Sequence, residues 1–197
     1  HFDESAECAS VIADTRGELD ALLWAGAAKR KSGQLDAALE DFVRVQLRAM
    51  GYGARFRREE LLALRQIAQC QSTKGNHGLA LSYMQRSMRT EQEADPLFRT
   101  PAAYVLLGKL QLKAGETANS VESLAQAVQL ADKEEDRPLQ AQALVLMGIA
   151  HQRMNDVVSS RREFEQARAL YAQLGQSGQA ARIEEAWREG GSLALPE

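Results

Sequence analysis

Proline, cysteine and long apolar runs are all scarce in this sequence of 197 residues, and each scarcity excludes a class of structure. The four prolines leave long uninterrupted segments between them. The two cysteines, Cys8 and Cys70, lie far apart without a CxxC pair, so we expect neither a disulfide framework nor a zinc site. No stretch approaches the roughly 18 consecutive apolar residues of a membrane helix, so we predict no membrane partner. Unpaired thiols are typical of a reducing compartment, and we therefore predict a cytoplasmic location.

An excess of charge of one sign is also missing. The 24 Lys and Arg residues and the 27 Asp and Glu residues give a formal net charge of −3. A nucleic-acid-binding chain would be strongly basic, so we expect no nucleic-acid partner. The basic run Arg55-Phe56-Arg57-Arg58 is followed at once by Glu59 and Glu60, which indicates a helix start of mixed charge. We expect these two glutamates to be solvated.

Residue patterns that carry catalysis or hold a metal are absent. The three histidines, His1, His77 and His151, do not occur at the short spacings of a zinc site. No nucleophile motif and no phosphate-binding glycine loop is present. We therefore predict no catalytic residue, no metal site, no cofactor and no enzyme activity. His151 is expected to be a packing residue, from its place in the repeat described below.

The chain does have an amino-acid composition typical of helices. The long segments between prolines are rich in Ala, Leu, Gln, Glu and Arg, which all favour helix. Alternating Val, Ile and Thr, which would indicate strands, is rare. The composition therefore predicts an all-α fold.

Helix-ending turns recur along the chain at a nearly constant interval. Glycine accepts the left-handed backbone conformation that ends a helix, and asparagine is the next most tolerant residue. The turns are Gly33-Gln34, Gly75-Asn76, Gly115-Glu116 and Asn155-Asp156. An interval of this size predicts an internal repeat of two helices.

Small and large side chains occupy constant places around each turn. Seven residues before it lies a small residue, five residues after it another, and nine residues after it a large apolar one. The three sets are Gly26, Ala68, Gly108 and Gly148; Ala38, Ala80, Ser120 and Ser160; and Phe42, Met84, Leu124 and Phe164. Small residues at matched distances from a hairpin predict a close crossing of its two helices.

These columns resemble the tetratricopeptide repeat. Windows of about one repeat length, starting at Leu19, Leu61, Pro101 and Ala141, share the pattern, so the resemblance covers most of the chain. It implies a right-handed α-solenoid of antiparallel helix pairs. The sequence departs from the family where an aromatic is usual, at Lys29, Gln71, Gln111 and His151. The interval between turns is longer than that of the regular family arrays, which implies longer helices. It resembles the longer-repeat branch of the family, which occurs in regulatory and adaptor proteins.

We predict one tetratricopeptide-like domain over residues 1–197. Its predicted parts are a second helix of an incomplete repeat at 2–15, helix pairs at 19–52, 61–94, 101–134 and 141–174, a capping helix at 178–189 and a tail at 190–197. Phe2 precedes Phe42 by one repeat interval, which indicates the incomplete repeat. Because the chain also begins with His, we expect it to be a fragment of a longer protein. Arg188 stands where the repeats have a small residue, so no second helix should pack on the capping helix.

The resemblance also implies a concave groove lined by the first helix of each pair. Helical geometry then turns one set of side chains toward this groove. The predicted groove residues are Trp24, Arg30, Lys31, Arg65, Gln69, Leu106, Lys109, Lys113, Ile149 and Arg153. Asp20 is the only acid among the groove positions, so we predict a protein or peptide partner with acidic residues and hydrophobic anchors. Trp24 is the expected anchor.

Three functions remain open from the sequence. The first is an interaction scaffold that holds a partner peptide in the groove. The second is a ligand- or signal-peptide-sensing regulatory domain of a larger signalling or transcription-regulating protein, which a cavity of small-molecule size would favour. The third is a homodimer formed through the solenoid edge left exposed by the incomplete repeat.

Overall fold

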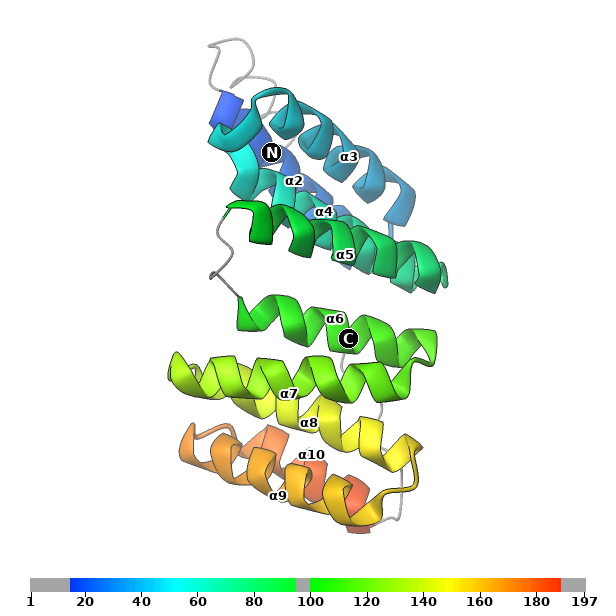
Figure 1. The fold of residues 1–197 in the computed structure, drawn as a ribbon, viewed down its shortest axis with the longest axis vertical. Coiled ribbons are helices and arrows are strands. Elements are labelled where there is room, and N and C mark those ends of the chain that lie inside the picture. The colour runs from blue at the N-terminus through cyan, green and yellow to red at the C-terminus, as the bar shows by residue number, and fades with distance from the viewer. Residues whose placement is uncertain (1–14, 95–99, 189–197) are drawn as a thin grey trace. The chain divides into compact units, whose positions relative to one another are not determined.

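The computed structural model describes residues 15–94 and 100–188, and these residues form α-helices joined by short turns (Figure 1). The helices are α2 (Thr15–Lys31), α3 (Leu35–Gly51), α4 (Arg57–Thr73), α5 (His77–Ala94), α6 (Pro101–Ala114), α7 (Thr117–Lys133), α8 (Arg137–Arg153), α9 (Val157–Gln173) and α10 (Ser177–Arg188). A 3-10 helix, η1 (Gly53–Phe56), precedes α4. The described ranges contain no strand, and the predicted all-α class is confirmed.

The chain divides into two compact units, residues 1–98 and 99–197. In the first unit, α2 pairs with α3 and α4 with α5, while α3 also packs on α4. In the second unit, α6 pairs with α7 and α8 with α9, and α10 packs on α9. The first helices of neighbouring pairs also touch, α2 against α4 and α6 against α8. Each unit is therefore a short stack of antiparallel helix pairs.

Helix bounds differ slightly from the predicted repeat ranges. Three first helices, α2, α4 and α8, begin four residues before the predicted starts, whereas α6 begins at Pro101 itself. The extra turn is what the long interval between the helix-ending turns requires. Apart from Thr15, which begins α2, the predicted incomplete repeat at 2–15 lies outside the described residues, and so does the tail at 190–197.

The predicted turns adopt the left-handed conformation. The φ angles are 81° at Gly33, 84° at Gly75, 82° at Gly115 and 59° at Asn155. In each turn the residue that follows donates its backbone N–H to a carbonyl five residues earlier, as Asp156 does to His151 at 2.9 Å. This bond caps the C-terminus of the first helix. The chain then reverses direction into the second, antiparallel helix.

Aspartates cap the starts of the last helix pair. The Asp136 carboxylate accepts a hydrogen bond from the Leu139 backbone N–H at 3.0 Å, at the start of α8. The Asp156 carboxylate accepts one from the Ser159 N–H at 3.1 Å, at the start of α9. Hydrogen bonds from the side chain and backbone of Ser159 hold the pKa of Asp156 below its ordinary value. Both contacts satisfy backbone donors that a helix start leaves open.

Glycines allow the two helices of a pair to cross closely. A Cβ atom placed on Gly26 would lie 2.7 Å from Cε1 of Phe42, and one on Gly148 would lie 2.7 Å from Cε1 of Phe164. In the third pair, a Cβ on Gly108 would lie 2.5 Å from Cγ of Leu124. The nearest neighbour of each glycine is thus the large residue nine positions after the turn.

Each unit has its own apolar clusters. In the first unit, Leu19, Leu22, Val45 and Phe56 belong to one cluster, and a second contains Phe42, Ile67 and Cys70. Burial raises the pKa of the Cys70 thiol, which favours the neutral form. The clusters of the second unit centre on Leu124 and Leu146 and on Phe164, Ile149 and Ile183. None of the described helices is long and apolar enough to span a bilayer.

Candidate partner-binding surface

The predicted groove residues of the first unit begin with Trp24 on α2. Its side chain is 64% exposed, an unusual state for a tryptophan. Lys31, in the last turn of α2, is also exposed, and Gln69 on α4 is half-buried. The exposed part of this first-helix surface thus carries an aromatic ring and a cation.

Two arginines of the predicted groove are engaged inside the first unit. Arg30 donates from Nε to Oε1 of Gln66 at 3.1 Å, which links α2 to α4. Arg65 turns toward α5 instead: its Nη2 lies 2.9 Å from Oε1 of Glu91, and its Nε donates to Ser87 Oγ at 3.2 Å. Because the Arg65 side chain is only 16% exposed and faces a buried carboxylate, its charge is largely neutralised within the helix pair.

In the second unit, the predicted residues of α6 lie at the surface only in part. Leu106, Lys109 and Lys113 are half-buried. Arg153, near the end of α8, is exposed and donates from Nη1 to the Leu112 carbonyl at 2.6 Å. This bond satisfies a carbonyl at the end of α6 and links the two first helices of the unit.

Ile149 corrects one expectation. Its side chain is 1% exposed and packs in the cluster of Phe164 and Ile183, so it does not face a partner. The reason is that α10 packs on α9 and adds Ile183 to the cluster that buries Ile149. Leu146, three residues before Ile149 on α8, is fully buried as well.

Polar cross-links within the first and last pairs were not predicted. Lys29 Nζ lies 2.8 Å from Oδ2 of the buried Asp41, and His151 Nδ1 lies 2.6 Å from Oε2 of the buried Glu163. Lys29 and His151 occupy the position where the family usually has an aromatic. The signal was present in the sequence as an acid twelve residues after each base. His151 therefore has a polar partner as well as a packing role.

The basic run at residues 55–58 surrounds a buried aromatic ring. Phe56 is buried, and the guanidinium carbons of Arg16 and Arg55 lie 5.6 Å and 5.5 Å from its ring centroid. Glu59 corrects the expectation of a solvated pair, since it is 2% exposed and its Oε1 lies 3.7 Å from Nε of Arg16. The two glutamates at the start of α4 thus form ion pairs within the first unit, Glu59 with Arg16 and Glu60 with Arg86.

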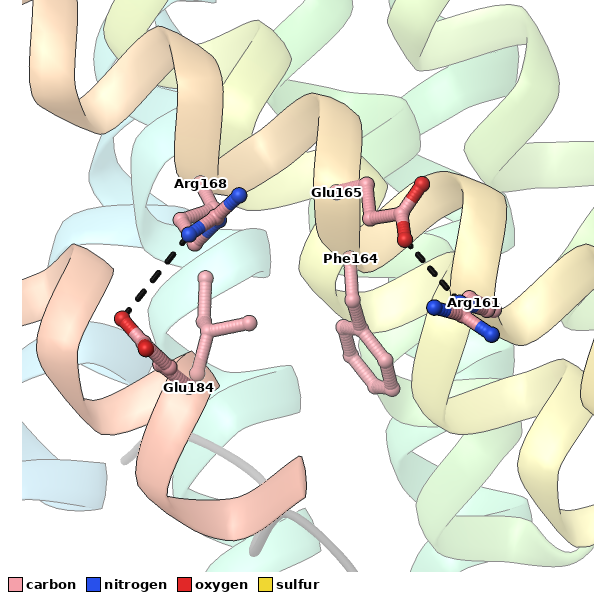
Figure 2. A pocket seen from close by; sticks show the side chains of 6 residues that line it. Arg161, Phe164, Glu165, Arg168 and Glu184 are labelled. Carbon is pink, nitrogen blue, oxygen red and sulfur yellow. Dashed lines mark hydrogen bonds and ion pairs between the residues drawn. The ribbon is translucent and has the colours of Figure 1, made fainter. Parts of the chain in front are cut away.

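A cavity of about 160 Å³ lies between α9 and α10. Phe164 and Ile183 form its apolar lining, and charged side chains surround them. Figure 2 shows two ion pairs at this rim, Arg161 with Glu165 at 3.0 Å and Arg168 with Glu184 at 3.8 Å. The space suits one medium-sized side chain.

The charged rim replaces residues that are apolar one repeat earlier. Arg161 corresponds to Val121, Arg168 to Val128 and Glu184 to Leu144. In the interior of the second unit, Val121 and Val128 pack against the core clusters, and Leu144 is buried. The face formed by α9 and α10 therefore carries ion pairs where an inner pair carries apolar contacts.

These features define a class of protein. Antiparallel helix pairs of similar length, joined by left-handed turns and in three of the four described pairs crossed at a glycine, are the units of a helical-repeat protein. Residues 99–173 match the family model described as Tetratricopeptide repeat, so the resemblance seen in the sequence is confirmed there. That match spans α6 to α9.

Solved structures support the same fold. The nearly identical TPR-like repeats of a Podosopora anserina protein assigned as a kinesin light chain superpose with a TM-score of 0.66 at 18% identity. That comparison covers 88% of this chain and 86% of the other. The structure of MamA gives a TM-score of 0.53 at 17% identity, covering 83% and 92%. A comparison with curated proteins gives no match.

Proposed function

We propose that the chain is a protein–protein interaction module whose first helices hold a segment of a partner protein. Tetratricopeptide repeats generally mediate interactions between proteins. The observation that carries the proposal here is Trp24, which is 64% exposed on a first helix. Tryptophan is among the residues most enriched in the few positions that dominate binding energy at interfaces, because it buries a large area on contact.

The charge of the first helices supports an acidic partner segment. In the first unit Lys31 is exposed, and in the second unit Arg153 is exposed and Lys113 is half-buried on α6. Arg65 does not add to this charge, because Glu91 neutralises it. Within each unit these cations favour carboxylates in the partner and raise its association rate.

A small-molecule sensor is supported less well. The cavity between α9 and α10 has a volume of about 160 Å³. Pockets for metabolite-sized ligands are usually roughly 300–1,000 Å³. Because this cavity of the described residues is smaller than such a pocket, we favour the interaction module, in the cytoplasmic location expected from the sequence.

Affinity capture from the native lysate with two matched variants tests the role of these cations. Lys31→Glu with Lys113→Glu reverses cations of the first helices. Arg89→Glu with Lys133→Glu makes the same charge change at exposed positions of the second helices. A partner retained by the wild type and the control but lost by the first variant is the expected result. Equal retention by both variants would refute the groove, and so would equal loss.

Trp24→Ala tests the anchor. Because the ring is mostly exposed, we expect the free energy of unfolding to change by less than about 0.5 kcal/mol. Partner affinity should fall roughly tenfold or more, since a buried interface tryptophan contributes more than about 1 kcal/mol. Circular dichroism melting and titration of the captured partner measure the two effects. A large loss of stability with unchanged affinity would show that Trp24 is a packing residue.

A further inference from the structure

An apolar stripe is exposed on the second helix of the first pair. Val43, Leu47 and Met50 follow one another on α3 at intervals of four and three residues, so they lie along one face of the helix. They are 37%, 63% and 45% exposed. None of them belongs to the groove predicted on the first helices. Contiguous apolar side chains on a helix surface, unlike scattered ones, indicate a contact surface.

The repeat itself provides an internal comparison. In α5 the corresponding positions hold Gln85, Arg89 and Gln92; in α7 they hold Ala125, Gln129 and Asp132; in α9 they hold Glu165, Ala169 and Ala172. Nearly all of these residues are exposed, so the positions face solvent in every pair. Only α3 carries three large apolar side chains there. The fold does not require apolar residues at these positions, which leaves a contact as the physical reason for them.

The border of the stripe is basic. Arg44 and Arg48 are exposed on α3, and Arg86 of α5 reaches Met50, with its Nη2 3.0 Å from the Met50 Sδ atom. Arg48 pairs with Glu18, and Arg86 lies 3.9 Å from the largely buried Glu60. Arg44 has no hydrogen bond or ion pair within the described part of the chain. Two exposed acids of α3, Asp36 and Glu40, precede the stripe on the same face, and Asp36 pairs with Lys74.

We propose that this surface, the α3 stripe with its arginine border, docks an acidic amphipathic helix of a partner protein. A stripe spaced at four and three residues matches the apolar face of a second helix. Carboxylates on the flanks of that helix would meet Arg44, Arg48 and Arg86. The α3 surface is thus a second interaction surface, distinct from the one on the first helices.

A second copy of the chain fits this surface poorly. If α3 packed antiparallel on its own copy about a two-fold axis, the same flank of each helix would come together. The flank that carries Arg44 and Arg48 would then meet itself, and like charges in such contacts oppose association. The charge of the border therefore favours an acidic partner over antiparallel self-association.

Two synthetic peptides test the proposal. Both have about 18 residues, enough for a helix to form on docking, and both carry leucines at intervals of four and three residues. One has glutamates on its flanks, and the other has lysines at the same positions. Fluorescence anisotropy with the whole chain should show binding of the glutamate peptide only, weakened by added salt.

Variants taken from the repeat locate the binding. Val43→Gln, Leu47→Arg and Met50→Gln together place the residues of α5 on α3, and they leave the border basic. Val157→Gln with Val158→Gln makes similar changes at exposed valines of α9. The triple variant should bind the glutamate peptide roughly tenfold more weakly, and the α9 variant should bind it as the wild type does. If the triple variant loses helicity, Leu47→Gln alone is used in its place.

The outcomes separate this surface from the groove. The proposal is overturned if both peptides bind equally, if neither binds, or if the triple variant binds the glutamate peptide unchanged. Loss of binding in Lys31→Glu with Lys113→Glu, but not in the triple variant, would place the peptide on the first helices and support the proposed function alone. Sedimentation velocity that shows a dimer abolished by the triple variant would assign the stripe to a second copy and overturn the acidic partner.

Discussion

Gly148 lies where α8 crosses α9, against the ring of Phe164. Replacing glycine with alanine inside a helix normally stabilises it, because alanine has the higher helix propensity. Here the new Cβ would lie 2.7 Å from the ring, so the helices or the ring must shift. We expect Gly148→Ala to lower the free energy of unfolding by about 1–2 kcal/mol, since overpacking exceeds the propensity gain. Urea denaturation measures the change.

Gly78 on α5 is the matched control for this substitution. A Cβ built there meets no side chain of a non-adjacent residue and no other helix within 4 Å in the described part of the chain, and the φ angle of Gly78 is not positive. Gly78→Ala should therefore raise the free energy of unfolding by about 0.5 kcal/mol. If both alanine variants were stabilised alike, the close crossing at Gly148 would be wrong.

The contact between His151 and Glu163 makes a second prediction at the residue scale. The Glu163 carboxylate is buried, and His151 Nδ1 approaches it at 2.6 Å. His151→Phe, which restores the family's usual aromatic, should cost about 1–3 kcal/mol because it removes the partner of a buried acid. Adding Glu163→Ser, the residue found as Ser123 one repeat earlier, should recover at least half of that loss.

A double-mutant cycle measured by urea denaturation separates this contact from simple packing. If the second substitution recovers nothing, the cost of His151→Phe comes from the ring itself rather than from the stranded carboxylate. Arg162 is the remaining cation near Glu163, with Nη2 3.4 Å from Oε1, and it is common to all four proteins of the cycle.

At the scale of elements, α9 and α10 show how charge sets the character of an exposed helix face. Arg161, Arg168 and Glu184 stand in places where the preceding repeat has apolar residues. Two ion pairs, Arg161 with Glu165 and Arg168 with Glu184 (Figure 2), lie around the cavity that Phe164 and Ile183 line. Exposed ion pairs add little stability, so we interpret them as opposing the addition of another apolar surface at this face.

We predict that restoring the apolar residues makes this face associate. Arg161→Val, Arg168→Val and Glu184→Leu together reproduce the residues of the inner pair and expose a larger apolar surface. Sedimentation velocity should then show oligomers whose fraction rises with protein concentration, whereas the wild type should not associate through this face. A triple variant with unchanged association would mean that the charges do not control contacts there.

At the scale of the whole molecule, the chain consists of two compact units with separate apolar clusters. The clusters around Leu124 and around Phe164 draw all their members from the second unit. The segment that matches the family model also lies entirely in this unit. A helix stack whose contacts are between neighbours needs only those neighbours to be stable.

A polypeptide of residues 99–197 should therefore fold by itself. We expect a helical circular dichroism spectrum and a cooperative thermal transition, because its clusters are complete without the first unit. A non-cooperative transition, or a spectrum without helix, would show that the second unit depends on the first.

Much of the fold follows from local features of the sequence. Gly33, Gly75, Gly115 and Asn155 end helices because few other residues adopt a positive φ at low cost, and all four do so here. The interval between these turns determines the length of the helices. The glycine seven residues before three of the turns marks the place where the two helices of a pair cross. These signals act over a few residues, so they can be recognised before any neighbour is known.

The surface that could bind a partner depended on the tertiary structure. Arg65 was expected in the groove, but its side chain binds Glu91 on the neighbouring helix α5 instead. Ile149 is buried because it shares a cluster with Ile183 of α10. The α3 stripe is exposed because none of the described helices covers it. A repeat places equivalent positions in the same helix register, but their neighbours differ from pair to pair. The sequence alone therefore determined the helix pairs and their turns, whereas only the packing of those pairs determined which side chains remain free to bind.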